Sequence, residues 1–311
     1  MNAASHEGVA LTSGPDQLGV TGNASAKGPA GPHRPGHVAQ TLILEAGHAR
    51  ANYWRDLWRY RELFAILAWR DIALRHRQSV LGIAWSVIRP LMTVLIFTVV
   101  FSRIAKLPSD GMAPYALMVF AGIIPWNLLS NIVGQGSNSL VSNAGLIGKV
   151  YFPRLIVPGS VIAVTLVDAA ISLGLLFAMM VWFGFVPDWR ILLLPVFIVF
   201  AVFVGLGPAL WLSAANVKYR DFQHIAAFAL QLGIYISPVG FSSTTVPEQW
   251  RLLYSLNPAV GVIDGFRWSL FHGEARLYLP GLLCSLGITA LMLWVGIAYF
   301  RKAERTFVDV I

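Results

Sequence analysis

The side chains that could do chemistry are few and scattered along the chain. His224 and His272 stand alone in its later part, and neither has further ligands at a spacing that suits a metal ion. The sequence contains no H-E-x-x-H and no G-x-S-x-G motif, and the acidic residues do not pair within any apolar run. We therefore predict no catalytic residue and no metal site, and hence a chain that is not an enzyme.

Residues 143–150, NAGLIGKV, resemble the end of a phosphate-binding loop. That motif needs a first glycine for its turn and a Ser or Thr after the lysine to hold Mg²⁺. Asn143 and Val150 occupy those two positions here. We therefore expect the chain to bind no nucleotide and no cofactor. If ATP drives its activity, a separate partner subunit uses the ATP and the Mg²⁺.

Asp168 is the acidic residue that lies within a long apolar run. An ionisable group at membrane depth is by default a functional hypothesis, and a proton-coupled or ion-coupled carrier uses such groups. Coupled carriers usually have several of them, however. We favour the alternative that Asp168 faces neighbouring helices and hydrogen-bonds to Ser or Thr side chains.

The elements that hold these residues are predicted membrane spans. The chain has 311 residues, of which 56% are hydrophobic and 12% charged, whereas a soluble domain carries roughly 25% charged residues. A helix needs about 20 apolar residues to cross a hydrocarbon core about 30 Å thick. The predicted fold is an all-α membrane protein with six transmembrane helices, near residues 88–101, 115–132, 156–183, 191–214, 222–239 and 278–300.

The basic residues indicate how the chain is oriented. A formal net charge of +8 could point to nucleic acid, but Lys and Arg are concentrated in the connections on one side of the spans, which is how membrane topology is encoded. Six spans put both termini on that side, so both are predicted to be cytoplasmic, with no nucleic-acid partner. Residues 1–50, which begin rich in Gly, Ala, Pro and Ser, are predicted to be a disordered cytoplasmic tail.

Two segments do not fit simple spans. Residues 53–78 place Trp and Leu at helical spacing among several Arg, which favours a helix lying in the headgroup plane over one packed on a soluble domain. Residues 240–277 alternate polar turns with apolar stretches too short to cross. We expect two short helices that dip into the outer leaflet as a re-entrant hairpin. An ordinary periplasmic loop is the alternative.

Five stretches in this order, around six spans, resemble one known family. They are residues 74–91, 149–154 (KVYFPR), 216–222 (NVKYRDF), 256–258 (LNP) and 300–311. From residue 53 to the end, the chain resembles the ABC-2 permeases, most closely those that export O-antigen, capsular polysaccharide, galactan or teichoic acid. The resemblance implies an ABC-2 type transmembrane domain over residues 53–311.

The resemblance also implies partners and roles. Two copies of the permease would pair above two ATP-binding cassette subunits, and a channel would carry a lipid-linked polysaccharide across the bacterial inner membrane. The helix at residues 53–78 would correspond to the gate helix, and the segment at residues 240–277 to an outer-leaflet gate. The residues that would press on the ATPases lie in two loops: Lys149, Tyr151, Phe152, Pro153, Arg154, Tyr219, Arg220 and Asp221.

Further site residues follow from charge and aromatic character. The gate helix and the entry of an anionic lipid headgroup are assigned to Trp54, Trp58, Arg70, Arg75 and Arg77. Aromatic rings often bind sugars, so Trp126, Trp211 and Tyr235 are channel candidates, although Trp and Tyr also anchor spans at membrane interfaces. The alternative functions are export of a small hydrophobic drug or lipid, an enzyme acting on lipid-linked sugars within the membrane, and a proton-coupled carrier.

Overall fold

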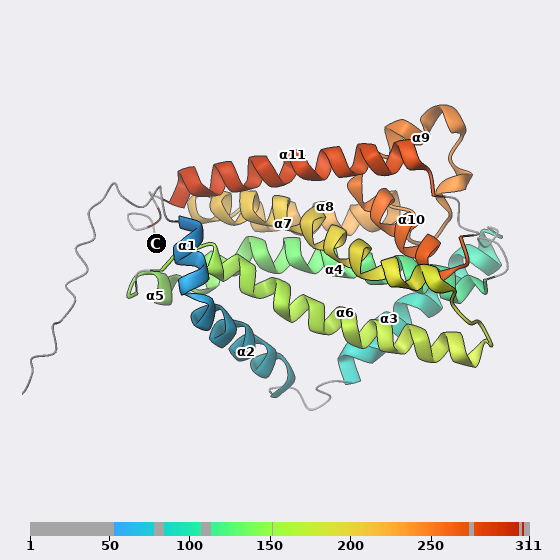
Figure 1. Ribbon diagram of the computed structural model, residues 1–311, viewed down its shortest axis with the longest axis horizontal. Coiled ribbons are helices and arrows are strands. Elements are labelled where there is room, and N and C mark those ends of the chain that lie inside the picture. The colour runs from blue at the N-terminus through green and yellow to red at the C-terminus, as the bar shows by residue number, and fades with distance from the viewer. Residues whose placement is uncertain are drawn as a thin grey trace, which may run out of the picture. The chain divides into compact units, whose positions relative to one another are not determined.

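The computed structural model describes residues 53–77, 84–106, 113–150, 152–273, 277–304 and 307. Within these ranges the chain forms helices and their connections and no strand, which confirms the all-α prediction (Figure 1). In order, the elements are α1 (Tyr53–Arg59), α2 (Arg61–Arg77), α3 (Ala84–Phe97), η2 (Thr98–Ile104), α4 (Tyr115–Ser142), α5 (Ala144–Ile147), α6 (Ile156–Trp182), η3 (Trp189–Leu193), α7 (Leu194–Lys218), α8 (Phe222–Ile236), η4 (Ser243–Thr245), α9 (Glu248–Tyr254), α10 (Pro258–Leu270) and α11 (Leu279–Ala303).

Among the described residues, five helices are long and apolar enough to cross a membrane, and they coincide with five of the six predicted spans. They are Val87–Ile104 (α3 with η2), Tyr115–Ser142 (α4), Ile156–Trp182 (α6), Trp189–Lys218 (η3 with α7) and Leu279–Ala303 (α11). The first of them runs unbroken through Pro90 and ends in a π-helical stretch. The predicted span at residues 222–239 is α8, which is shorter than expected.

The early end of α8 has a local cause. Ser237 is extended, with a ψ of 154°, because the following Pro238 disfavours the helical conformation of the residue before it. The helix therefore has 15 residues. At 1.5 Å per residue it rises about 22 Å, which is less than the hydrocarbon thickness of about 30 Å.

The central helix is α4, which contacts α3, α6, α7, α8 and α10. In its most apolar window 78% of the residues are buried, against 17–39% in the other four candidate spans. These outer helices therefore turn much of their apolar surface away from the protein. α7 and α11 approach closely at Gly207 and Gly296, where a side chain on Gly296 would collide with the Gly207 backbone.

The helix directions define two ends of the bundle. Figure 1 shows α1, α5 and the C-terminal end of α11 at one end, together with the connections that follow α4 and α7, and α9 and α10 at the other. We call these the α1 end and the α10 end. Segments that are distant in sequence are thereby brought to the same end.

Both unusual segments contain the expected helices, with one difference. The helix predicted over residues 53–78 is divided at Tyr60 into α1 and α2. The Phe64 N–H still donates to the Tyr60 carbonyl at 3.1 Å, so the division is a bend in a continuous hydrogen-bonded helix. Between α8 and α11 the chain forms α9 and α10, the two short helices that were expected, and α10 packs against α4, α7 and α11.

Candidate functional site

The predicted coupling loops meet at the α1 end. On α7, the Asn216 side-chain amide donates to the Ser137 carbonyl at 3.2 Å and to Asn138 Oδ1 at 2.9 Å on α4, so the stems of the two loops are hydrogen-bonded to each other. Beyond these stems, four of the predicted coupling residues are exposed: Lys149, Tyr219, Arg220 and Asp221. We call these four the coupling surface. Its charges and one aromatic ring are suited to a protein interface.

Phe152, Pro153 and Arg154 of the first loop are directed inward. Phe152 is 3% exposed and packs in a cluster with Leu67 of α2 and Phe300 of α11. Pro153 and Arg154 are buried as well. Tyr151 lies outside the described residues. These buried side chains can position the loop, whereas direct contact with a partner would fall to the exposed residues.

Arg154 connects the loop to the segment that follows α11 at the α1 end. Its N–H donates to Glu304 Oε1 at 3.0 Å, its guanidinium donates to the Glu304 carbonyl oxygen, and the guanidinium lies 5.5 Å from the Phe307 ring centre. The Tyr53 hydroxyl, on α1, donates to the same Glu304 Oε1 at 3.5 Å. We call Tyr53, Arg154 and Glu304 the Glu304 junction. Burial raises the pKa of the Glu304 carboxyl above its ordinary value, although the hydrogen bonds from Arg154 and Tyr53 oppose that shift.

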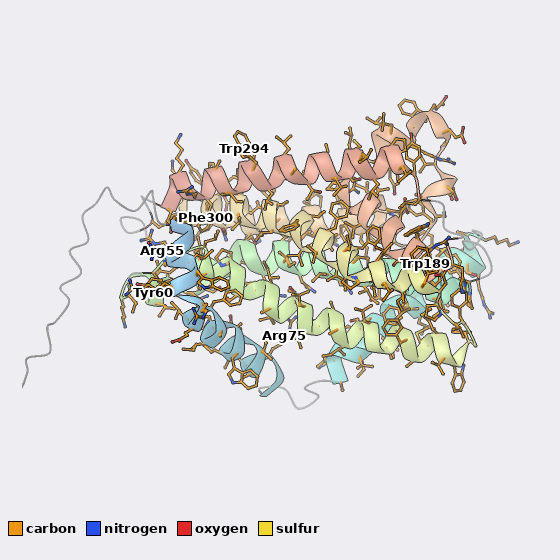
Figure 2. The ribbon with its side chains drawn as sticks, viewed as in Figure 1. Arg55, Tyr60, Arg75, Trp189, Trp294 and Phe300 are labelled. Carbon is orange, nitrogen blue, oxygen red and sulfur yellow. The ribbon has the colours of Figure 1, made fainter. Side chains whose placement is uncertain are left out.

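The predicted headgroup arginines are engaged within the chain. Arg75 Nη1 lies 2.8 Å from Asp168 Oδ2, which joins α2 to the middle of α6 (Figure 2). Arg70 pairs with Asp71 at 2.7 Å and donates to Asn143 Oδ1 at 2.9 Å. The side chain of Arg77 lies outside the described part. Asp168 thus has an arginine partner on the neighbouring helix α2.

Of the two tryptophans predicted for the gate helix, the structure describes the side chain of Trp58. Trp58 is 73% exposed, so its ring is free to lie in a headgroup layer. The side chain of Trp54 is not among those described. α2 packs on α6, with Leu67 and Ala68 buried between them. The helix therefore has one buried apolar side and one exposed side that carries tryptophan.

The three channel candidates differ in accessibility. Tyr235 is 63% exposed on α8 and stacks on Phe97 of α3, with ring centres 6.4 Å apart. Trp211 is 38% exposed and borders other aromatic rings. Trp126 is buried against α8 at Gly233, where an added Cβ would lie 2.6 Å from its ring. Of the three, Tyr235 is the most exposed and so the most accessible to a ligand.

Sequence reasoning missed the residues that extend this face of α8. His224, Phe228, Gln231 and Tyr235 are all exposed and recur every three or four residues, so they form one stripe along the helix. We call it the α8 stripe. The signal that could have found it is Gln231, a polar side chain within an apolar run.

Sequence reasoning also missed Arg267, to which it assigned no role. Arg267 is 0% exposed and donates to the carbonyl oxygens of Met118 at 3.1 Å, Phe241 at 2.9 Å and Val239 at 2.8 Å. It thereby holds the irregular segment after α8 against α4. In the neighbouring LNP motif, Asn257 caps α10 by accepting from the Ala259 N–H at 3.1 Å and donates to Ser237 Oγ at 2.9 Å.

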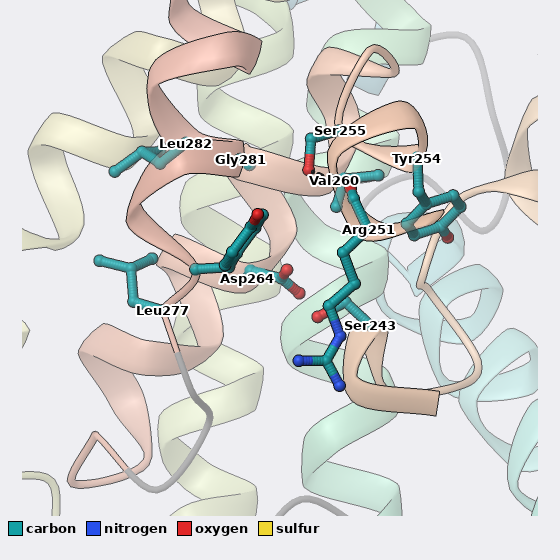
Figure 3. Close-up of a pocket in the computed structure, with 11 residues that line it drawn as sticks. Ser243, Arg251, Tyr254, Ser255, Val260, Asp264, Leu277, Gly281 and Leu282 are labelled. Atoms are coloured by element: carbon teal, nitrogen blue, oxygen red, sulfur yellow. Dashed lines mark hydrogen bonds between the residues drawn. The ribbon is translucent and has the colours of Figure 1, made fainter. Parts of the chain in front are cut away.

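A small pocket with polar and apolar lining lies at the α10 end (Figure 3). Figure 3 shows Arg251, Tyr254 and Asp264 around it, and its volume is about 20 Å³, enough for one water molecule. Burial and the nearby Asp264 raise the pKa of the Tyr254 hydroxyl, so it stays protonated at neutral pH and donates to the Ile236 carbonyl at 2.8 Å. In the described ranges, no group of three His, Cys, Asp or Glu side chains could hold a metal ion.

Comparison with known proteins gives a consistent result. The family model described as ABC-2 type transporter matches residues 62–271. An O-antigen export system permease protein RfbA from Myxococcus xanthus is 27% identical over 257 residues, which cover 82% of this chain and 97% of that protein. An RfbA from Klebsiella pneumoniae is 23% identical, covering 80% and 95%. The polysialic acid transport protein KpsM from Escherichia coli is 22% identical, covering 76% and 91%.

Proposed function

The chain belongs to the ABC-2 type transporter family, and from this premise we propose that it is the permease subunit of an ATP-driven exporter that moves a lipid-linked polysaccharide from the cytoplasm across a bacterial inner membrane. The observation that carries the proposal is the extent of the similarity, which spans 97% and 95% of two permeases named for O-antigen export. Similarity over nearly the whole of these relatives supports a shared transport architecture and not merely a shared local motif.

In the proposed topology the α1 end is cytoplasmic, and α8 with the segment after it makes the sixth crossing. The basic residues Lys149, Arg220 and Arg301 at the α1 end support this orientation by the positive-inside rule. Irregular backbone at membrane depth must have its polar groups satisfied by protein. The hydrogen bonds from Arg267 to the carbonyls of Val239 and Phe241 meet that requirement, and they support a re-entrant hairpin of α9 and α10 in the outer leaflet.

The permease would act as a homodimer that pairs through α3 and α8. Both helices expose large apolar side chains on the same protomer: Trp85, Met92, Leu95, Ile96, Val99, Val100 and Ile104 on α3 and η2, and Ile225, Phe228, Leu232, Tyr235 and Ile236 on α8. The stacked rings of Phe97 and Tyr235 bring these two helices together. A twofold pairing would enclose a channel between the two copies, and its walls would be these helices.

The α8 stripe would face the polysaccharide in that channel. Aromatic faces pack on sugar rings, and an amide can hydrogen-bond to hydroxyl groups, which suits Phe228, Gln231 and Tyr235. A glutamine facing lipid would be unfavourable, since polar side chains within membranes usually face protein or a water-filled cavity. The stripe therefore extends the channel prediction made for Tyr235, while the burial of Trp126 suits packing between α4 and α8.

Two ATP-binding cassette subunits would dock on the coupling surface and would bind the ATP and the Mg²⁺. Lys149, Tyr219, Arg220 and Asp221 would contact them directly. Movement of the loop would then pass through Arg154 to Glu304 at the end of α11 and to Tyr53 on α1. ATP binding can drive transport only if it favours one arrangement of the permease over another. The Glu304 junction joins the loop before α6 to α1 and to the end of α11. A change in the loop on ATP binding could therefore shift both helices.

The gate helix would lie at the inner headgroup layer, with Trp58 and the arginines of α2 near the point where the lipid-linked polymer enters. The ion pair between Arg75 and Asp168 would fix the far end of α2 on α6. That pairing also weighs against the ion-coupled carrier, because the carboxylate charge is already matched. Export of a small hydrophobic drug or lipid is the remaining alternative, and the polar and aromatic α8 stripe favours a sugar over it.

The test is copurification of the full chain with its ATP-binding subunit, followed by ATP turnover in nanodiscs. We expect a stable complex whose turnover rises with lipid-linked polysaccharide, and we expect Gln231→Ala and Phe228→Ala to reduce that rise. Leu291→Ala, on the exposed apolar side of α11, is the matched control and should leave it unchanged. Stimulation by small hydrophobic compounds instead of the polymer would support the alternative exporter, and absence of any complex would refute the proposal.

A further inference from the structure

An apolar cavity lies under the bend between α1 and α2, apart from the α8 stripe and the coupling surface. Its volume is about 360 Å³, within the range of ligand-binding pockets. Three helices form it besides the bend, through the first turns of α6, the middle of α7 and the later part of α11. The lining side chains are Leu57, Arg61, Phe64, Leu155, Ile156, Ile162, Phe203, Leu206, Leu210, Leu293 and Ile297, together with Gly159.

The cavity opens toward the apolar outer surface of the helix bundle. Phe64 and Phe203 on its wall are 36% and 43% exposed, whereas Ile156 and Leu210 at its base are 2% and 1% exposed. Ile297 lies six residues before the end of α11 at Ala303, or about 9 Å along the helix axis. The cavity is therefore close to the α1 end but within the apolar length of the candidate spans.

Arg61 is the charged side chain of the lining, and no acidic side chain accompanies it there. In the described part of the chain its guanidinium makes no ion pair, in contrast to Arg70 and Arg75 on the same helix, which pair with Asp71 and Asp168. A lone cation at the rim of an apolar cavity is complementary to an amphiphile with one negative charge. A guanidinium also binds a phosphate oxygen pair with good geometry.

We infer that this cavity holds an acyl chain of an anionic phospholipid from the surrounding leaflet, with its phosphodiester on Arg61. One guanidinium matches the single charge of a phosphodiester better than the higher charge of a pyrophosphate. A cavity of about 360 Å³ also suits one acyl chain and not a much longer polyprenyl chain. The lipid would fill the space between the α1–α2 bend and the bundle and so hold the bend on α6, α7 and α11.

The inference uses the apolar helices and the cavity alone, so its test does not require transport. The full chain is purified in detergent, and binding of phosphatidylglycerol and of phosphatidylcholine with the same acyl chains is measured by native mass spectrometry. We expect the wild type to prefer phosphatidylglycerol, and Arg61→Gln to weaken its binding about fivefold and abolish the preference. Arg59→Gln, an exposed arginine that does not line the cavity, is the matched control and should keep both.

A second variant keeps the charge and fills the space. Ile162→Trp on α6 should reduce the binding of both lipids, and a melting temperature close to that of the wild type in lipid-free detergent shows that it is folded. The inference is wrong if Arg61→Gln and Arg59→Gln weaken phosphatidylglycerol binding equally, or if the two lipids bind the wild type equally well. It is also wrong if polyprenyl pyrophosphate displaces the bound lipid at equal concentration, because the cavity would then belong to the substrate path.

Discussion

Replacing Arg267 by methionine removes a buried guanidinium while keeping an unbranched side chain in its place. The backbone carbonyls of Val239 and Phe241, in the irregular segment after α8, then lose the donor that this guanidinium provides, whereas the Met118 carbonyl lies within the hydrogen-bonded helix α4. Leaving a buried polar group without a partner costs about 1–3 kcal/mol, so two give about 2–6 kcal/mol before relaxation. Because the segment after α8 can shift and admit water, we expect the lower part of that range, a loss of at least about 2 kcal/mol in the free energy of unfolding.

Arg251→Met is the matched control. Arg251, on the short helix α9, also donates to two carbonyls, of Val246 at 3.0 Å and Thr244 at 3.1 Å, but its side chain is 25% exposed, so water can replace it. Its loss should cost less than about 1 kcal/mol. Tryptophan fluorescence during unfolding in mixed detergent and dodecyl sulfate micelles measures both variants. If they differ by less than about 1 kcal/mol, Arg267 does not hold the outer hairpin as we describe.

Three other predictions can be tested independently. If Arg75 and Asp168 stabilise α2 through their ion pair, Arg75→Gln and Asp168→Asn should each cost about 1 kcal/mol and the double variant little more, as a double-mutant cycle would measure; additive losses would contradict the pairing. Burial raises the pKa of Glu304 above 4.5, so its contribution to stability is fully present below pH 4.5 and is lost as the pH rises through the folded pKa. Glu304→Gln should therefore reduce the fall in melting temperature that the wild type shows as the pH rises above 4.5. If the melting temperature of the variant falls as steeply with pH as that of the wild type, another group is responsible. Arg220→Glu on the coupling surface should lower the amount of copurified ATP-binding subunit about tenfold, whereas Lys106→Glu at the opposite end of the bundle should not; equal effects would indicate a nonspecific charge contribution.

The sequence was sufficient to predict most of the helices, because their apolar runs are long enough to be recognised by length alone. α8 shows the limit of that reasoning. Its apolar run continues to Val239, but the helix ends at Ile236 since Pro238 acts on the residue before it. The bend at Tyr60 has no comparable marker, since the helical hydrogen bonds continue through it.

Contacts between distant residues were the part that the sequence could not provide. Arg154 had the composition of an interface anchor, yet its partner Glu304 is 150 residues away and turns it inward. Arg267 had no assigned role until its three carbonyl partners were known. The sequence singled out Arg154 but not Arg267, and in both cases only the fold determined what the side chain binds.

The most direct test of the central claim is export in cells that lack this gene. In such cells the lipid-linked polysaccharide is labelled and its location is measured by the access of a periplasmic glycosidase. Our account predicts that the polymer accumulates on the cytoplasmic side and that the wild-type gene restores its export, while Gln231→Ala restores it only in part. Normal appearance of the polymer outside the membrane in cells without the gene would contradict the account.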